Sequence, residues 1–114
     1  MKLFGLKNCD TCKKALKALE AVGRTVEFVD VRADGVAPDD LKTWIAAHGI
    51  ETMVNTRSTT WRGLEEADRA GVSSAEGALA LLQEHPALMK RPVIVDGSCS
   101  FVGWTKAVQE ALLQ

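Results

Sequence analysis

The sequence lacks a long apolar run and also lacks a predominance of one charge. No stretch approaches the roughly 20 consecutive apolar residues that a membrane-spanning helix needs. The N-terminus does not show the basic and then apolar pattern of a signal peptide. The formal net charge of the 114 residues is −1, which gives no electrostatic reason to bind nucleic acid or an anionic membrane. We therefore expect a cytoplasmic protein that has neither a nucleic acid nor a membrane as partner.

Cysteine is scarce, and the count is odd. The chain has three cysteines, which argues against a closed framework of disulfide bonds. The composition, 46% hydrophobic and 25% charged, is ordinary for a globular protein. We expect one domain over residues 1–114, long enough to bury a core without cross-links. Because cytoplasmic thiols stay reduced, two cysteines close in sequence are more often catalytic or metal-binding than structural there.

Two of the cysteines form a Cys-Asp-Thr-Cys motif at residues 9–12. The apolar run Met1–Leu6 predicts a strand before it, and apolar residues at helical spacing predict a helix after it. Cys9 is thus expected where the strand ends and the helix begins. A helix N-terminus carries partial positive charge and unpaired N–H groups, and Lys13 and Lys14 follow within one turn. We expect Cys9 to lose its proton more readily than a free cysteine, and the thiolate is the reactive form.

The rest of the chain predicts a mixed α/β order, β-α-β, several helices and then β-β-α. A cysteine motif at the first strand–helix junction of this order is the arrangement of thioredoxin-like folds. We therefore predict an α/β, thioredoxin-like fold with a helical insertion at about residues 38–88. The remaining predicted elements of its core are strands at Thr25–Val31, Val93–Val95 and Cys99–Val102, a hairpin turn at Asp96-Gly97, and a last helix from about Trp104.

Helix signals also divide the insertion. Pro38 followed by two acidic residues predicts a helix start, and Gly49 predicts its end. Ser73 or Ser74 is expected to cap a later helix. Thr56–Arg62 lies between these helices and is polar, basic and rich in hydroxyl groups, so we expect it to form a surface loop.

Four segments of the chain match the pattern of a known family: Lys7–Ala15, Asn55–Arg62, Lys90–Ile94 and Val102–Trp104. Together they resemble the arsenate reductase-like (ArsC/Spx) family, in particular its YffB-type subgroup. The resemblance extends over essentially the whole chain. It implies a thioredoxin-like core with a helical insertion, a nucleophilic cysteine at Cys9, and glutathione or glutaredoxin as partner.

The resemblance also implies roles for two arginines and a proline. Arsenate reductases of this family surround the oxyanion with one cysteine and three arginines. Arg57 and Arg91 match two of these arginines by their surrounding residues, but the third has no counterpart, since Phe101–Lys106 contains no arginine. Pro92 matches the cis-proline that thioredoxin-like folds place beside the active cysteine.

Other interpretations of these residues remain open. Cys12 is either the resolving cysteine or a small core residue on the apolar stripe of its helix. Asn8 and Thr11 are either helix caps and donors to the thiolate or plain turn residues. A zinc site is not expected, because structural zinc needs four ligands and the chain has no second paired spacing of cysteine or histidine. Cys99 is interpreted as a packing residue.

The function predicted from these observations is that of a glutathione-linked thiol oxidoreductase. Cys9 and Cys12 would be the catalytic residues, with glutathione as co-substrate and no bound cofactor or metal. The substrate contacts would come from Asn8, Thr11, Arg57, Arg91 and Pro92. Two alternatives are an arsenate reductase proper that uses glutathione or glutaredoxin, and an Spx-like redox-sensing regulator that binds RNA polymerase.

Overall fold

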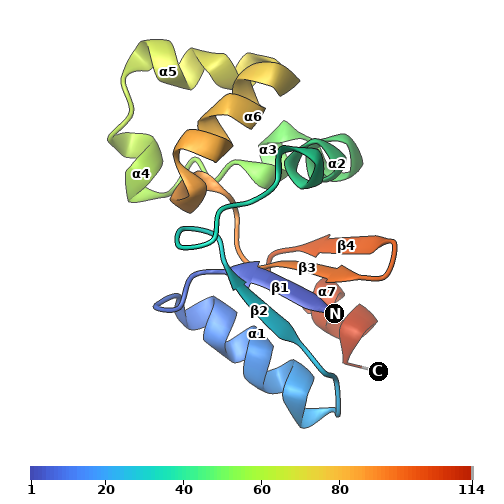
Figure 1. Ribbon diagram of the computed structural model, residues 1–114. Helices are drawn as coiled ribbons and strands as arrows, with labels where there is room; N and C mark the ends of the chain where they lie inside the picture. Colours follow the sequence, from blue (N-terminus) through green and yellow to red (C-terminus); the bar gives the residue numbers. More distant parts are fainter. Residues whose placement is uncertain (114) are drawn as a thin grey trace. The chain divides into compact units, whose positions relative to one another are not determined.

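The computed structural model describes residues 1–113 and divides into two compact units. The first unit contains residues 1–34 and 91–113 and carries a β-sheet (Figure 1). The second unit, Gly35–Lys90, is helical. In the described part of the chain no helix is both long enough and apolar enough to cross a membrane. The single domain expected over residues 1–114 stays a prediction.

The first unit is a four-stranded mixed sheet with helices. The strand order is β2-β1-β3-β4, in which β1 pairs parallel with β2 and antiparallel with β3, and β3 pairs antiparallel with β4. The predicted order β-α-β followed by β-β-α is confirmed. The elements are β1 (Lys2–Gly5), α1 (Asp10–Ala21), β2 (Glu27–Asp30), β3 (Val93–Asp96), β4 (Cys99–Val102) and α7 (Lys106–Leu112).

An apolar row across the sheet forms the base of the core. Leu3 lies opposite Phe28 on one side and opposite Ile94 on the other, and Ile94 lies opposite Phe101. Because paired residues point to the same face, these side chains form one surface. Helices α1 and α7 pack on it (Figure 1). The buried residues that they contribute are Cys12, Ala15, Leu19, Val108 and Leu112.

Helix α1 ends just before a glycine that reverses the direction of the chain. Gly23 has a φ of 86°, a left-handed conformation that favours glycine. Its N–H donates to the carbonyl of Glu20 (3.0 Å), and the N–H of Arg24 donates to that of Leu19 (3.1 Å). These two bonds form a Schellman motif, which satisfies carbonyls at the helix end and turns the chain toward β2.

The hairpin turn between β3 and β4 differs by one residue from the predicted turn. Asp96 pairs with Cys99, so Gly97 and Ser98 are the two loop residues. Gly97 has a φ of 62°, and no non-glycine residue in the described chain has a positive φ. A positive φ at the first loop residue alone is the pattern of a type II′ turn. Asp96 is therefore the last residue of the strand and precedes the two central residues of the turn.

The second unit consists of short helices around α2 and α6. Thr56–Arg62 is only partly a loop, because Thr59–Arg62 forms one helical turn, and the Ser58 hydroxyl oxygen caps it by accepting from the N–H of Trp61. The predicted cap at Ser74 is confirmed, since its hydroxyl oxygen accepts from the N–H of Gly77. The helices are α2 (Pro38–His48), α3 (Ile50–Met53), α4 (Thr59–Arg62), α5 (Glu66–Ala70) and α6 (Ala75–Glu84), with 3₁₀ turns η1 (Gly71–Ser73) and η2 (Pro86–Leu88).

Replacing Gly77 with alanine is expected to destabilise the second unit. Gly77 lies in α6 against η1, and a Cβ added there would overlap the carbonyl group of Gly71. Alanine favours a helix over glycine by about 1 kcal/mol, but a clash with backbone atoms costs typically ~1–3 kcal/mol or more. We expect Gly77→Ala to lower the free energy of unfolding, measured by urea denaturation.

Gly63→Ala is the matched control for Gly77→Ala. Gly63 ends α4 with a φ of −80°, and an added Cβ would be 3.5 Å from the nearest atom, the Thr59 carbonyl oxygen. That distance is an ordinary van der Waals contact. Gly63→Ala should therefore change the free energy of unfolding of the protein by no more than about 0.5 kcal/mol. Equal effects of the two substitutions would contradict the packing described between α6 and η1.

Candidate functional site

Cys9 lies where β1 gives way to α1, as predicted. It is the N-cap residue of α1, with an extended backbone (φ −90°, ψ 117°), and its side chain is half-buried. The turn before it is closed by a bond from its own N–H to the carbonyl of Leu6 (3.1 Å). The N–H of Lys13 then donates to the Cys9 carbonyl (3.0 Å) as the first bond of the helix. Together these bonds fix the thiol at the positive end of α1.

The pKa of the Cys9 thiol is lowered by its neighbours. Partial burial acts in the opposite direction and would raise the pKa, but it is outweighed. The lowering comes from the N–H and the thiol of Cys12 and from the Arg91 guanidinium, all of which favour the thiolate. The Cys9 sulfur does not meet the geometry of a helix cap, yet the Cys12 N–H still stabilises its charge. These neighbours therefore make the half-exposed Cys9 sulfur easier to ionise than a free cysteine.

The cause of this shift differs from the one expected from the sequence. Lys13 and Lys14 are exposed, and neither is among the largest causes of the Cys9 pKa shift. Water screens a charge that extends into solvent. The stabilising cation is instead Arg91, which is far from the motif in sequence.

Cys12 is a core residue, one of the two roles considered for it, and its role as the resolving cysteine stays a prediction. It is fully buried on the apolar stripe of α1, so it is a core residue. Its pKa is raised to about 12, first by burial and then by the charge of Cys9, despite the opposing N–H of Leu6 and Arg91. Its thiol thus keeps its proton and hydrogen-bonds to the Cys9 thiolate.

Gly5 makes room for Cys12 at the end of β1. A Cβ on Gly5 would lie 2.5 Å from the Cys12 sulfur, which is closer than a carbon and a sulfur can approach. Sequence reasoning missed this residue. The only signal was a glycine at the end of an apolar run, just before the cysteine motif.

The segment before β3 brings Arg91 and Pro92 to the same unit as the cysteines. The peptide bond between them is cis, as the resemblance implies. The Pro92 carbonyl accepts from the N–H of Gly103 (2.8 Å), which follows β4 with a φ of 81°. Nε of Arg91 is buried, which fixes the guanidinium that acts on Cys9.

The other predicted site residues are not shown to contact the Cys9 thiol. Asn8 and Thr11 are exposed, and neither caps α1 because Cys9 occupies that position. Cys99 is exposed in β4, so its interpretation as a packing residue is wrong. Arg57 belongs to the second unit. The substrate contacts expected of Asn8, Thr11, Arg57, Arg91 and Pro92 stay predictions.

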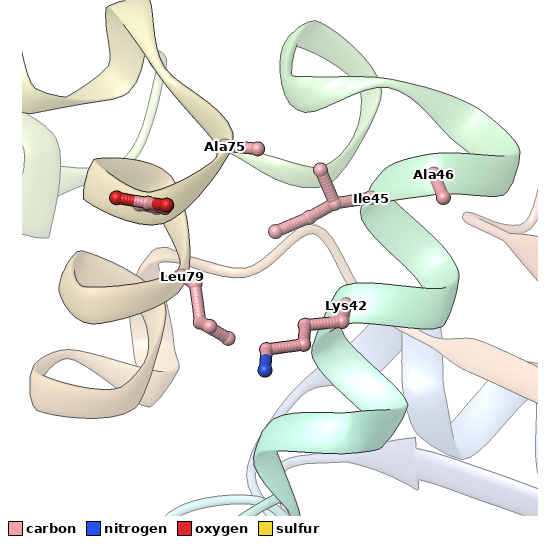
Figure 2. A pocket seen from close by; sticks show the side chains of 6 residues that line it. Lys42, Ile45, Ala46, Ala75 and Leu79 are labelled. Carbon is pink, nitrogen blue, oxygen red and sulfur yellow. The ribbon is translucent and has the colours of Figure 1, made fainter.

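Within residues 1–113, no three His, Cys, Asp or Glu side chains gather in a way that could hold a metal ion. A hollow of about 260 Å³ lies between α2 and α6, where Ile45 and Leu79 project into the gap (Figure 2). Its lining is mainly apolar, with Lys42 and Glu76 as the charged members. Its lining contains no cysteine, so it is not a candidate site for thiol chemistry.

The ArsC family model matches residues 4–112. A solved structure of a protein named YFFB is 35% identical, with a TM-score of 0.92, covering 99% of this chain and 98% of its own. A solution structure of an arsenate reductase (ArsC) related protein from Brucella melitensis is 34% identical, with a TM-score of 0.74 and coverage of 96% and 91%.

Curated relatives of this chain include an uncharacterized protein and transcriptional regulators. The uncharacterized protein, from Haemophilus influenzae, is 37% identical over 96% of this chain and 95% of its own length. A global transcriptional regulator Spx from Streptococcus mutans is 25% identical over 97% of this chain and 81% of its own.

Alkylation at varied pH tests the electrostatics of the site. We expect iodoacetamide to modify Cys9 with a midpoint below 9.0, the ordinary pKa of a thiol, and Cys12 to stay protected until pH approaches about 12. Peptide mass spectrometry separates the three cysteines. Faster modification of Cys12 than of Cys9 below neutral pH would contradict the assignment.

Substitution of Arg91 tests which cation stabilises the thiolate. Arg91→Met should move the Cys9 midpoint upward, because it removes a positive charge and a hydrogen-bond donor. Lys14→Gln is the matched control and should leave the midpoint unchanged, since Lys14 is exposed. An upward shift in the lysine variant alone would restore the explanation based on the helix-start lysines.

Proposed function

Because the chain belongs to the ArsC family, we propose that it is a glutathione-linked thiol oxidoreductase with Cys9 as nucleophile. The observation that carries the proposal is the electrostatic pairing of the two cysteines. One half-exposed sulfur has a lowered pKa, and the buried sulfur beside it has a raised pKa. Neighbouring groups whose pKa values are pushed apart are typical of reactive sites.

In the first step the Cys9 thiolate attacks one sulfur of a disulfide such as oxidised glutathione. The bond between the two glutathione sulfurs breaks as the bond to Cys9 forms. One glutathione leaves as a thiolate and takes up a proton from water. The other stays on Cys9 as a mixed disulfide, so the protein has been oxidised and one glutathione reduced.

In the second step a thiolate resolves the mixed disulfide. The thiolate of a further glutathione attacks the bound glutathione sulfur, which regenerates the Cys9 thiolate and forms oxidised glutathione. The two steps together give a net reaction when the disulfide of the first step joins glutathione to another thiol, which is then released in reduced form. Alternatively, Cys12 loses its proton and attacks the Cys9 sulfur, releasing glutathione and forming a disulfide between Cys9 and Cys12. The negative charge of Cys9 helps to raise the Cys12 pKa, and the mixed disulfide removes that charge. Modification of Cys9 therefore makes Cys12 easier to ionise.

The same cysteine could attack arsenate, but the chain supplies fewer arginines for an oxyanion than arsenate reductases have. A hydrogen bond to a charged group contributes about 1.5–3 kcal/mol, so the absence of one arginine weakens oxyanion binding by roughly one to two orders of magnitude. A carboxylate of glutathione has only two oxygens and needs fewer donors. We propose that Arg57 and Arg91 serve such carboxylates, with Asn8, Thr11 and Pro92 as further contacts.

A redox-sensing regulator is the second candidate, favoured by the curated relatives named global transcriptional regulator Spx. In that case the chain would bind RNA polymerase, and oxidation of Cys9 and Cys12 would change the binding. A pull-down of polymerase with the reduced and the oxidised protein, run beside a glutathione turnover assay, separates the two candidates. Turnover without polymerase binding supports the enzyme.

Two cysteine variants test the order of steps. Cys9→Ser should abolish thiol transfer, because it removes the nucleophile. Cys12→Ser should still form the glutathione adduct on Cys9, and that adduct should persist longer if Cys12 resolves it. Mass spectrometry after oxidised glutathione measures both. An adduct lifetime equal to that of the unchanged protein would leave free glutathione as the sole resolving thiol.

We predict weak or absent arsenate reduction and measurable thiol transfer with glutathione. Arg91→Ala should lower both rates, since Arg91 acts on Cys9 itself. Steady-state assays with each substrate give the comparison. Efficient arsenate turnover at micromolar substrate would mean that another donor replaces the missing arginine.

A further inference from the structure

The second unit contains a polar hollow that sequence reasoning did not identify. Its volume is about 450 Å³, within the range of small-molecule sites. Its lining differs from that of the hollow between α2 and α6, because charged and polar side chains predominate. The lining residues are Glu51, Val54, Asn55, Thr56, Arg57 and Lys90.

The residues that line the hollow are held by a short, buried β-bridge between the segment around Val54 and the segment around Met89. Val54 pairs antiparallel with Met89, and both are almost fully buried. The N–H of Lys90 donates to the Met53 carbonyl (2.8 Å), and the N–H of Asn55 donates to the Leu88 carbonyl (2.9 Å). The backbone positions that carry the lining residues on both segments are therefore held in a fixed register.

A turn that begins at Asn55 fixes the backbone that leads to Arg57. Oδ1 of Asn55 accepts from the N–H of Arg57 (3.1 Å), and the Asn55 carbonyl accepts from the Ser58 hydroxyl (2.8 Å). The Asn55 NH₂ group bonds to no protein group within residues 1–113. Asn55 thus supports the turn with its oxygen and keeps both N–H donors for a ligand.

Three charged groups face this hollow without pairing with one another in the described chain. Arg57 and Lys90 supply two positive charges and Glu51 supplies one negative charge. A simple oxyanion would be attracted by the two cations but repelled by Glu51. A simple cation would be repelled by Arg57 and Lys90. A ligand that carries a carboxylate and an ammonium group close together complements all three.

We propose that this hollow binds an α-amino acid head group, and specifically the γ-glutamyl end of glutathione. Arg57 and Lys90 would bind its α-carboxylate, and Glu51 would bind its α-ammonium group. The inference rests on the proposed function, which requires glutathione. Lys90 is also joined directly to Arg91, whose guanidinium acts on Cys9. A residue that lines the hollow and the residue that stabilises the Cys9 thiolate are thus neighbours in the chain.

Calorimetric titration of the Cys9→Ser protein tests the proposal without thiol exchange. The probe is S-methylglutathione, compared with its analogue that lacks the α-amino group and with free glutamate. Glu51→Gln should weaken the binding of S-methylglutathione about tenfold, as expected for a lost charged hydrogen bond. The same substitution should leave the binding of the analogue unchanged. Lys90→Gln should weaken the binding of both S-methylglutathione and its analogue, because both carry the α-carboxylate. Free glutamate that binds as tightly as S-methylglutathione would mean that the site selects amino acids in general and would overturn the assignment to glutathione.

Control variants in the same unit are Glu66→Gln and Lys42→Gln, exposed residues outside this hollow, and both should bind S-methylglutathione as the Cys9→Ser protein does. The proposal would be overturned if Glu51→Gln lowered the affinity for S-methylglutathione and for its analogue equally. It would also be overturned if neither Glu51→Gln nor Lys90→Gln lowered the affinity for S-methylglutathione. Failure of the proposed function is distinguished by the reaction of unchanged protein with 2-hydroxyethyl disulfide. Reaction at Cys9 without recognition of S-methylglutathione rejects this site alone, whereas an inert Cys9 rejects the redox function.

Discussion

The pairing of β1 with strands on both sides is the constraint on which the first unit depends. β1 bonds in parallel to β2 and antiparallel to β3, so Lys2, Leu3 and Phe4 are fixed along both edges and Gly5 along one. The strand therefore ends at a defined position, and the turn after it delivers Cys9 to the start of α1. Leu3 in the same strand is fully buried beneath α1 and α7. The packing that stabilises the sheet thus also sets the position of the nucleophile.

The chemistry at Cys9 arises from a division of roles between two similar side chains. The thiolate is favoured on the sulfur that reaches solvent and disfavoured on the sulfur in the core. A buried thiol that retains its proton is a hydrogen-bond donor, and a donor stabilises a neighbouring anion. The burial of Cys12, which alone would suggest an inert residue, is therefore what makes it useful to Cys9. Arg91 adds the positive charge from a distant part of the chain.

Periodicity in the sequence was sufficient to predict most of the fold. The strand–helix junction at Cys9 and the apolar stripe through Cys12 follow from local patterns, and local patterns persist when the chain folds. The Arg91 interaction could not be predicted from spacing alone, because it depends on pairing between strands far apart in sequence. Solvent exposure was equally inaccessible, so Lys14 was given too large an electrostatic role and Cys99 was wrongly assigned to packing. The charged hollow of the second unit was missed because its residues come from two segments joined only by a backbone bridge.

The contact between Gly5 and Cys12 has a consequence for chemical damage. Oxidation beyond the thiol adds oxygen atoms to sulfur, and each added atom needs volume. Cys12 is fully buried, and its sulfur lies so close to Gly5 that even a methyl group there would overlap it. Peroxide thus has room to act on the half-exposed Cys9 but not on its neighbour. The tight end of β1 leaves the Cys9–Cys12 motif with one sulfur that is open to over-oxidation and a second that is protected from it.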